Sequence, residues 1–252
     1  LQRDLSVSYI KLGDLHTALG NGQLALRYFE DSLAIAKELV DREPGRSDLQ
    51  RDLSLSYDRL GDQHRALGNG ELALRYFEDC LAIAKQLVDR EPGRSDLQRD
   101  LSISYERLGD LHTALGNGQL ALRYFEDALA IAKELVAREP NNYQAQSGLA
   151  QSFARMAAVE PEQASTWLDK SVLIQRRRLE QQPNNVITAV ELAIVLFRLG
   201  QVHARAGQME PAAEAFTEAH ALFKTLEQKN ALDVRYKHML EWLNNAASGS
   251  GG

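Results

Sequence analysis

LQRDLS at residues 1–6 is the stretch that decides the fold, because it occurs again at residues 49–54 and at residues 97–102. The copies follow one another as a 48-residue repeat, and residues 1–48 and 49–96 differ at only eight positions. Two degenerate copies follow, and prolines 44, 92, 140 and 183 punctuate the ends of four repeats. A fixed period of this kind is typical of repeat proteins, in which each repeat packs mainly against its neighbours.

Each repeat predicts two helices joined by a short turn. In the second repeat, apolar residues recur at helical spacing over residues 49–60, and Ser47 with Gln50 has the spacing of a capping box. Gly68-Asn69-Gly70 tolerates left-handed backbone and ends this helix. A second helix is expected over residues 71–90, where a Glu-Pro-Gly sequence stops it.

The pattern therefore predicts an all-α fold, an α-solenoid of five helix hairpins closed by a C-terminal capping helix. The expected repeats are residues 1–48, 49–96, 97–142, 143–185 and 186–232. The cap is expected at residues 233–245, started by Asp233, with Tyr236, Met239, Leu240 and Leu243 on one face. Residues 246–252 are expected to be a flexible linker or tag remnant. No equivalent cap precedes Leu1, so the sequence favours a piece of a longer array with an unprotected N-terminal end.

Composition limits the classes of function. The net charge of −6 disfavours nucleic acid and anionic membranes, both of which would repel the chain. No apolar run reaches the length of about 18 residues that suggests a membrane span. Cys80 is the single cysteine, so no internal disulfide forms, and we expect a reducing compartment, the cytoplasm.

The residues resemble the tetratricopeptide repeat family, whose pattern places an aromatic residue, Leu-Gly, a second aromatic, Ala, Phe and Pro at fixed spacing. The first repeat matches it with Tyr9, Leu12-Gly13, His16, Ala25 and Phe29. The repeat is longer than the length of about 34 residues that is typical of the family, and it looks like the long variety found in multidomain bacterial signalling proteins. The resemblance implies a right-handed superhelix whose first helices line a concave groove that binds peptides or protein segments.

Nothing in the sequence assembles a catalytic site, so we expect no enzyme, no cofactor and no metal. The repeated glycines, such as Gly61, are expected where the two helices of a repeat pack closely. The histidines at 16, 64, 112 and 203 are expected to fill the family's aromatic position, because equivalent histidines on helices about 8–10 Å apart cannot share one zinc ion. Cys80 is expected to be a buried, inert thiol. Arg176-Arg177-Arg178 is interpreted as a solvated surface, although the stem of Arg178 can cover apolar surface.

The differences between copies point to a binding surface. Five of the eight lie in the first helix, at 7/55, 10/58, 11/59, 15/63 and 17/65; drift at exposed sites is the alternative explanation. The candidate groove residues are Ile10, Lys11, Asp14 and Thr17, then Asp58, Arg59, Asp62 and Arg65, then Glu106, Arg107, Asp110 and Thr113. Their mixture is net acidic, so the expected partner is a basic or amphipathic segment of another protein. Asp62→Lys with Asp110→Lys is then expected to abolish binding.

The leading hypothesis is a non-catalytic scaffold for protein–protein interaction, one segment of a larger multidomain protein. A second hypothesis from another class is an engineered or excised structural module that self-associates end to end through its uncapped N-terminal end. Its support is the near-identical repeats, the open start and the Gly-Ser tail.

Overall fold

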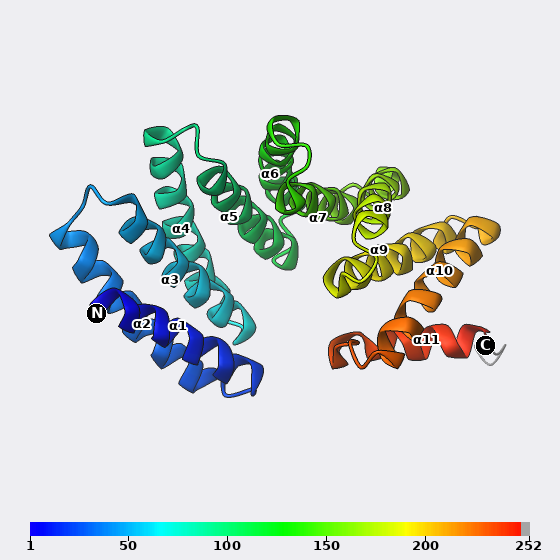
Figure 1. Cartoon of the computed structure of the whole chain (residues 1–252), viewed down its shortest axis with the longest axis horizontal. Helices are drawn as coiled ribbons and strands as arrows, with labels where there is room; N and C mark the ends of the chain where they lie inside the picture. The colour runs from blue at the N-terminus through cyan, green and yellow to red at the C-terminus, as the bar shows by residue number, and fades with distance from the viewer. Residues whose placement is uncertain (248–252) are drawn as a thin grey trace. The chain divides into compact units, whose positions relative to one another are not determined.

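The structure is a computed structural model that describes residues 1–247. Within that range it holds eleven α-helices, two short 3-10 turns and no strand, which confirms the all-α prediction (Figure 1). The helices are α1 (Gln2–Ala18), α2 (Gly22–Arg42), α3 (Ser47–Ala66), α4 (Gly70–Arg90), α5 (Ser95–Ala114), α6 (Gly118–Arg138), α7 (Tyr143–Val159), α8 (Ala164–Gln181), α9 (Val186–Arg205), α10 (Met209–Gln228) and α11 (Lys237–Ala247), with turns η1 (Pro161–Gln163) and η2 (Val234–Tyr236). The chain divides into two compact bodies, an N-terminal body of residues 1–135 and a C-terminal body from Val136 onward.

In the N-terminal body, α1 with α2 and α3 with α4 form antiparallel hairpins, and each second helix also packs on the first helix of the next repeat (Figure 1). One buried cluster joins Ala25, Phe29, Leu33 and Ala36 of α2 to Leu53 and Leu60 of α3. An equivalent cluster joins α4 to α5. Because each cluster crosses a repeat boundary, the stack of repeats is what buries the apolar surface.

Glycines fix two features of the hairpin. Gly68 has a φ of 79°, which non-glycine residues rarely adopt, and it turns the chain between α3 and α4. Gly61 packs against the ring of Phe77, and a Cβ atom added to it would lie 2.5 Å from Phe77 Cε1. Equivalent contacts join the other three glycines, Gly13, Gly109 and Gly200, to Phe29, Phe125 and Phe216. The expected close packing at these glycines is confirmed.

The predicted capping box is wrong. Helix α3 begins at Ser47, its N-cap residue is Arg46, and that cap makes no side-chain hydrogen bond. The Ser47 hydroxyl donates to the carboxylate of Glu91, and Gln50 Nε2 donates to the Pro44 carbonyl at 2.8 Å. The helix starts one residue earlier than the sequence spacing implies, so Ser47 lies inside the first turn, where it bonds to the end of its own hairpin.

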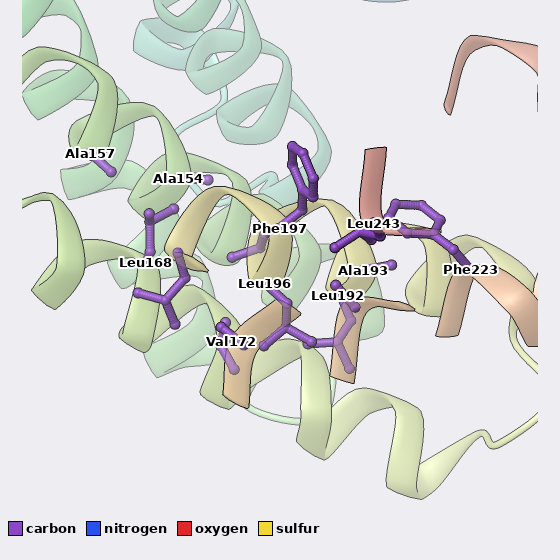
Figure 2. Packing of buried hydrophobic residues seen from close by; sticks show 14 of the residues in the cluster. Ala154, Ala157, Leu168, Val172, Leu192, Ala193, Leu196, Phe197, Phe223 and Leu243 are labelled. Carbon is purple, nitrogen blue, oxygen red and sulfur yellow. The ribbon is translucent and has the colours of Figure 1, made fainter. Parts of the chain in front are cut away.

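The C-terminal body contains the hairpins α7–α8 and α9–α10, followed by α11. Figure 2 shows its core, in which Leu168 and Val172 of α8 lie beside Leu192 and Leu196 of α9. The Asp233 carboxylate accepts a hydrogen bond from the Arg235 backbone N–H at 2.9 Å and caps the turn η2. Helix α11 begins after this turn, at Lys237, and not at Val234 as the sequence pattern predicts. The four apolar residues expected on one face of that segment all belong to this core: Leu240 and Leu243 are buried, and Tyr236 and Met239 pack against it. Helix α11 extends to Ala247, beyond the expected end, and the linker prediction for residues 248–252 lies outside the described residues.

Helix α9 is long and apolar enough to cross a membrane by length and composition, with a mean hydropathy of 1.5. No uninterrupted apolar run of about 18 residues occurs in it, because Glu191 and Arg198 interrupt the helix, so the helix meets a test by mean hydropathy without containing such a run. The apolar residues of α9, including Leu192, Ala193 and Leu196, form the centre of the core in Figure 2, and 44% of the segment is buried. Core helices that are buried on several sides are apolar for this reason.

Candidate functional site

A pocket of about 480 Å³ opens on the N-terminal body. Its lining comes mostly from α3 and α5, the first helices of the second and third repeats, with contributions from α1 and α4. This volume lies within the range of small-ligand and side-chain binding pockets, roughly 300–1,000 Å³. The pocket therefore lies mainly along the first helices of the second and third repeats.

The apolar part of the pocket lining, here called the floor, is partly open to solvent. Leu55 of α3 and Ile103 of α5 occupy equivalent positions, and each is 39% exposed. Buried Ala84, Leu87 and Leu97 also line the pocket. Exposed apolar surface gathered in a concavity is a common mark of an interaction site, whereas single exposed leucines are ordinary.

Ion pairs between consecutive repeats border this floor. Arg3 Nη1 donates to Asp48 at 2.9 Å, and Arg3 also pairs with Asp52. One repeat later, Arg51 makes the same two pairs, to residues 96 and 100. The hydrogen bonds that Arg51 donates to Asp100 raise the pKa of Arg51 against the opposing effect of its partial burial. The first helices of successive repeats are thus held together by a repeated arginine clamp.

The acidic ladder expected in the groove is paired with arginines. Arg59 Nε lies 3.0 Å from Asp14, and Arg59 Nη1 donates to Asp58 at 3.1 Å. Arg107 Nε donates to Asp58 at 3.0 Å, and its Nη2 lies 3.0 Å from Asp62. Burial raises the pKa of Asp62, although Arg107 opposes that rise. These carboxylates serve the contacts between repeats, so they offer a ligand much less negative charge than the sequence implies.

Burial changes the interpretation of one groove position. Ile10, Asp58 and Glu106 are equivalent, and all three are buried. A helical wheel of one helix places this position beside the groove stripe, but in the stack an arginine of the next repeat reaches over Asp58. Only Asp58, Arg59 and Arg107 among the twelve predicted groove residues line the pocket.

The other predicted groove residues lie elsewhere on the first helices. Lys11 is exposed, and Asp110 is half-buried. Three more make hydrogen bonds within the protein: Thr17 Oγ1 to Gln63 at 3.0 Å, Arg65 Nη2 to Asp62 at 2.9 Å, and Thr113 Oγ1 to the Gly109 carbonyl at 2.8 Å.

The predicted groove residues do not include the charged residues that border the pocket, among them Arg3, Arg51 and Asp52. They are identical in the first three repeats, whereas the groove residues are predicted from positions that differ between repeats. The signal that could have found them is an Arg-Asp pair that recurs in each of the first three repeats, together with an Asp that ends the first two. Each arginine is thereby placed to pair with two aspartates of the next helix hairpin.

The repeated histidines pack on tyrosine rings. His64 stacks on Tyr76 with ring centroids 5.4 Å apart, and His16 and His112 make the same contact with Tyr28 and Tyr124. Burial lowers the pKa of His64, which favours its neutral form. Within residues 1–247 no group of three His, Cys, Asp or Glu side chains is arranged to hold a metal ion.

Arg178 contradicts the expectation of a solvated arginine run. Its side chain is 1% exposed, its guanidinium lies 4.0 Å from the ring centroid of Tyr143, and Nη1 donates to Glu191 at 2.8 Å. Arg176, two residues earlier, stays partly exposed and pairs with Glu218 at 3.0 Å. One residue of the run therefore belongs to the interior of the C-terminal body.

Comparison with known families gives two kinds of match. Models described as tetratricopeptide repeat match residues 4–69 in one case, and residues 54–92 and 103–140 in another. A model of anaphase-promoting complex subunit 5 matches residues 135–248. A search of curated proteins found no match.

Solved structures share the fold at low sequence identity. BtubC (BKLC) from P. vanneervenii has a TM-score of 0.67 at 17% identity, covering 90% of this chain and 82% of that one. A putative kinesin light chain from Podosopora anserina with nearly identical TPR-like repeats has a TM-score of 0.55 at 22% identity, covering 90% and 98%. Aspartyl phosphate phosphatase F from Bacillus subtilis has a TM-score of 0.66 at 13% identity, covering 94% and 54%. Together with the repeated helix hairpins, the family matches over residues 4–92 and 103–140 establish that the chain belongs to the tetratricopeptide repeat family.

Proposed function

We propose that the N-terminal body is a non-catalytic interaction module that binds a segment of another protein in the pocket between α3 and α5. The observation that carries this proposal is the solvent-open floor of Leu55 and Ile103 inside a border of paired charges. Tetratricopeptide repeat proteins typically serve protein–protein interaction, which supports the class of function and leaves the partner open.

The pocket favours an amphipathic segment over a strongly basic one. Five arginines and four aspartates line it, and most of them pair with one another. A ligand lysine would have to compete with these arginines for the carboxylates. An apolar side chain placed on Leu55 and Ile103 displaces water without breaking an ion pair, and polar groups on either side of it can bond to the border.

A panned peptide library tests the proposal. Displayed random 12-residue peptides are selected on the full chain, and the enriched peptides are titrated by fluorescence anisotropy. We expect Leu55→Glu with Ile103→Glu to weaken their binding at least about tenfold, because a buried apolar contact is replaced by two charges. The control is Leu173→Glu, at an exposed leucine of α8 in the other body.

Equal binding to the double variant, with its helical circular dichroism unchanged, would contradict the pocket as the site. Asp62→Lys with Asp110→Lys is a weaker test, because Asp62 pairs with Arg65 and Arg107. A lysine there would place like charges together and disturb the stack itself.

We also propose the cytoplasm as the compartment in which the chain works. The support is the single cysteine, Cys80, which is buried and forms no disulfide. Fractionation that finds the chain in an oxidising compartment would contradict this proposal.

A further inference from the structure

One apolar position of the first helix stays exposed in three consecutive repeats. It holds Val7 in α1, Leu55 in α3 and Ile103 in α5, with exposed fractions of 37%, 39% and 39%. Helix α3 has a neighbouring repeat on each side, so this exposure belongs to the position and does not depend on where the chain begins. The residue type changes between repeats, but it is a branched apolar residue each time. We call these three residues the apolar row.

Ion pairs lie on both sides of the apolar row. On α3, Arg51 stands four residues before Leu55 and Asp62 stands seven residues after it, so all three share one face of the helix. Ion pairs on these two sides join consecutive first helices: Arg3 to Asp52 and Arg59 to Asp14 between α1 and α3, and Arg51 to Asp100 and Arg107 to Asp62 between α3 and α5. The row therefore crosses the first helices between two lines of ion pairs.

The spacing of the row restricts the conformation of a ligand. Neighbouring helices pack about 8–10 Å apart, so consecutive members of the row are expected about 10 Å apart. In a polyproline II segment, residues three apart project from the same side and are separated by about 9 Å along the chain. Side chains on one face of a β-strand are only about 7 Å apart. A polyproline II segment with an apolar side chain at every third residue therefore matches the row, and a strand does not.

A ligand helix matches the spacing but not the width. Apolar residues seven apart on a helix are separated by about 10.5 Å. The Cα atoms of Arg51 and Arg59, on either side of Leu55, lie about 12 Å apart along α3, and the arginine side chains occupy part of this distance. A helix with its side chains is itself about 10–12 Å wide. Its backbone groups bond to one another, whereas an extended segment presents free N–H and C=O groups to the carboxylates and guanidinium groups on both sides.

The charges beside the row favour an uncharged ligand. The arginines and aspartates that line the pocket are nearly equal in number, and the pairs made by Arg51 and Arg107 tie them together. A charged ligand residue of either sign would compete with one of these pairs. Neutral polar residues can bond to a paired carboxylate or guanidinium without separating the pair, because each group keeps further hydrogen-bonding positions.

We propose that the apolar row binds an extended, uncharged segment of another protein that carries an apolar side chain at every third residue, one each for Val7, Leu55 and Ile103. This proposal rests on the proposed function and adds the conformation and the spacing of the partner. It also extends the binding surface along α1, since Val7 is not among the residues that line the pocket.

Designed peptides with one composition and three spacings test this proposal. Each peptide has fifteen residues, three leucines and twelve neutral polar residues, with blocked ends and with the leucines at every second, third or seventh position. The full chain is titrated into each labelled peptide and binding is followed by fluorescence anisotropy. We expect the period-three peptide to bind at least about tenfold more tightly than the other two, because it alone places all three leucines on the row.

Val7→Glu tests the part of the row that lies outside the pocket. It should weaken binding of the period-three peptide at least about fivefold. A peptide that keeps only two leucines, three residues apart, can occupy Leu55 and Ile103 and should bind the variant and the natural chain equally. Leu24→Glu is the matched control, because Leu24 is also 37% exposed but lies on α2. Circular dichroism checks that both variants keep their helices, and Val7→Thr, of nearly the same shape, replaces Val7→Glu if that variant is unfolded.

The possible outcomes separate this proposal from the proposed function. Library peptides that bind through Leu55 and Ile103, together with no preference for period three or no effect of Val7→Glu, would overturn the period-three proposal and leave the pocket as the site. A preference for period seven, with a gain of helical circular dichroism on binding, would overturn it in favour of a helical ligand. If neither selected nor designed peptides bind up to about 1 mM, both proposals fail.

Discussion

At the scale of single residues, the contact between Gly61 and Phe77 limits how closely the two helices of a repeat approach. The added Cβ of an alanine would lie 2.5 Å from Phe77 Cε1 and 2.6 Å from Cδ1, distances that force the ring or the helix to move. Phe77 is completely buried, so it has little room to yield.

We therefore expect Gly61→Ala to lower the free energy of unfolding by about 1–3 kcal/mol, measured by urea denaturation. Gly148→Ala is the matched control, because Gly148 also lies within a helix but nothing lies within 4 Å of its added Cβ. The control should stabilise the chain by about 0.5–1 kcal/mol through its higher helix propensity. Equal stability of the two variants would contradict this account.

Cys80 gives a second prediction at this scale, through pH. Its Sγ lies 3.1 Å from Ser54 Oγ and 3.4 Å from Ser104 Oγ, and burial raises the pKa of the thiol above its ordinary value of 9.0. The folded state disfavours the thiolate, so the stability that depends on this group is complete below the unfolded pKa and declines as the pH rises through the folded one.

Between about pH 9 and pH 10.5, the free energy of unfolding should fall more steeply for the natural chain than for Cys80→Ala. Alanine is a suitable replacement because Ala128 fills the equivalent position. Parallel pH profiles from urea denaturation would show that the thiol does not contribute.

At the scale of an element, α8 shows how one helix separates two chemically identical residues. Its buried side carries Leu168, Val172 and Arg178, and its outer side carries Arg176, which pairs with Glu218 of α10. Arg178 pairs with Glu191 of α9 beneath the surface. A buried charge that loses its partner is costly, whereas an exposed pair contributes little.

We expect Arg178→Met to lower the free energy of unfolding by about 3 kcal/mol, because Glu191 loses its guanidinium partner. Arg176→Met should cost less than about 1 kcal/mol, since both partners of its pair are partly exposed. Thermal and urea unfolding of the two variants check this difference, and similar losses would contradict the assignment of Arg178 to the interior.

At the scale of the whole molecule, the chain consists of two compact bodies in which stability arises from contacts between neighbouring helices. In arrays of this kind, stability is approximately a sum of local terms, so a substitution destabilises mainly the helices near it. Gly61→Ala should therefore speed amide exchange mainly within residues 1–135, and Arg178→Met mainly within residues 136–247. Hydrogen exchange followed by mass spectrometry measures this, and equal acceleration in both bodies would show that the chain unfolds as one unit.

The sequence by itself determined the helices, the turns and the close contacts within each hairpin. These features depend on residues near in sequence or on patterns that recur in each repeat, such as Gly61 opposite Phe77 and Gly68 at the turn. Only the tertiary structure decided which charges remain available to a ligand. Asp58 reads as an exposed acid on a single helix, but stacking brings Arg107 from the first helix of the next repeat to cover it. Arg178 is likewise predicted to be solvated when its own helix is considered alone. In the structure its partner Glu191 lies on the next helix, and the packing of the two helices buries the arginine. Local periodicity specifies which face of a helix a residue occupies, whereas the packing of neighbouring helices decides whether that face meets water.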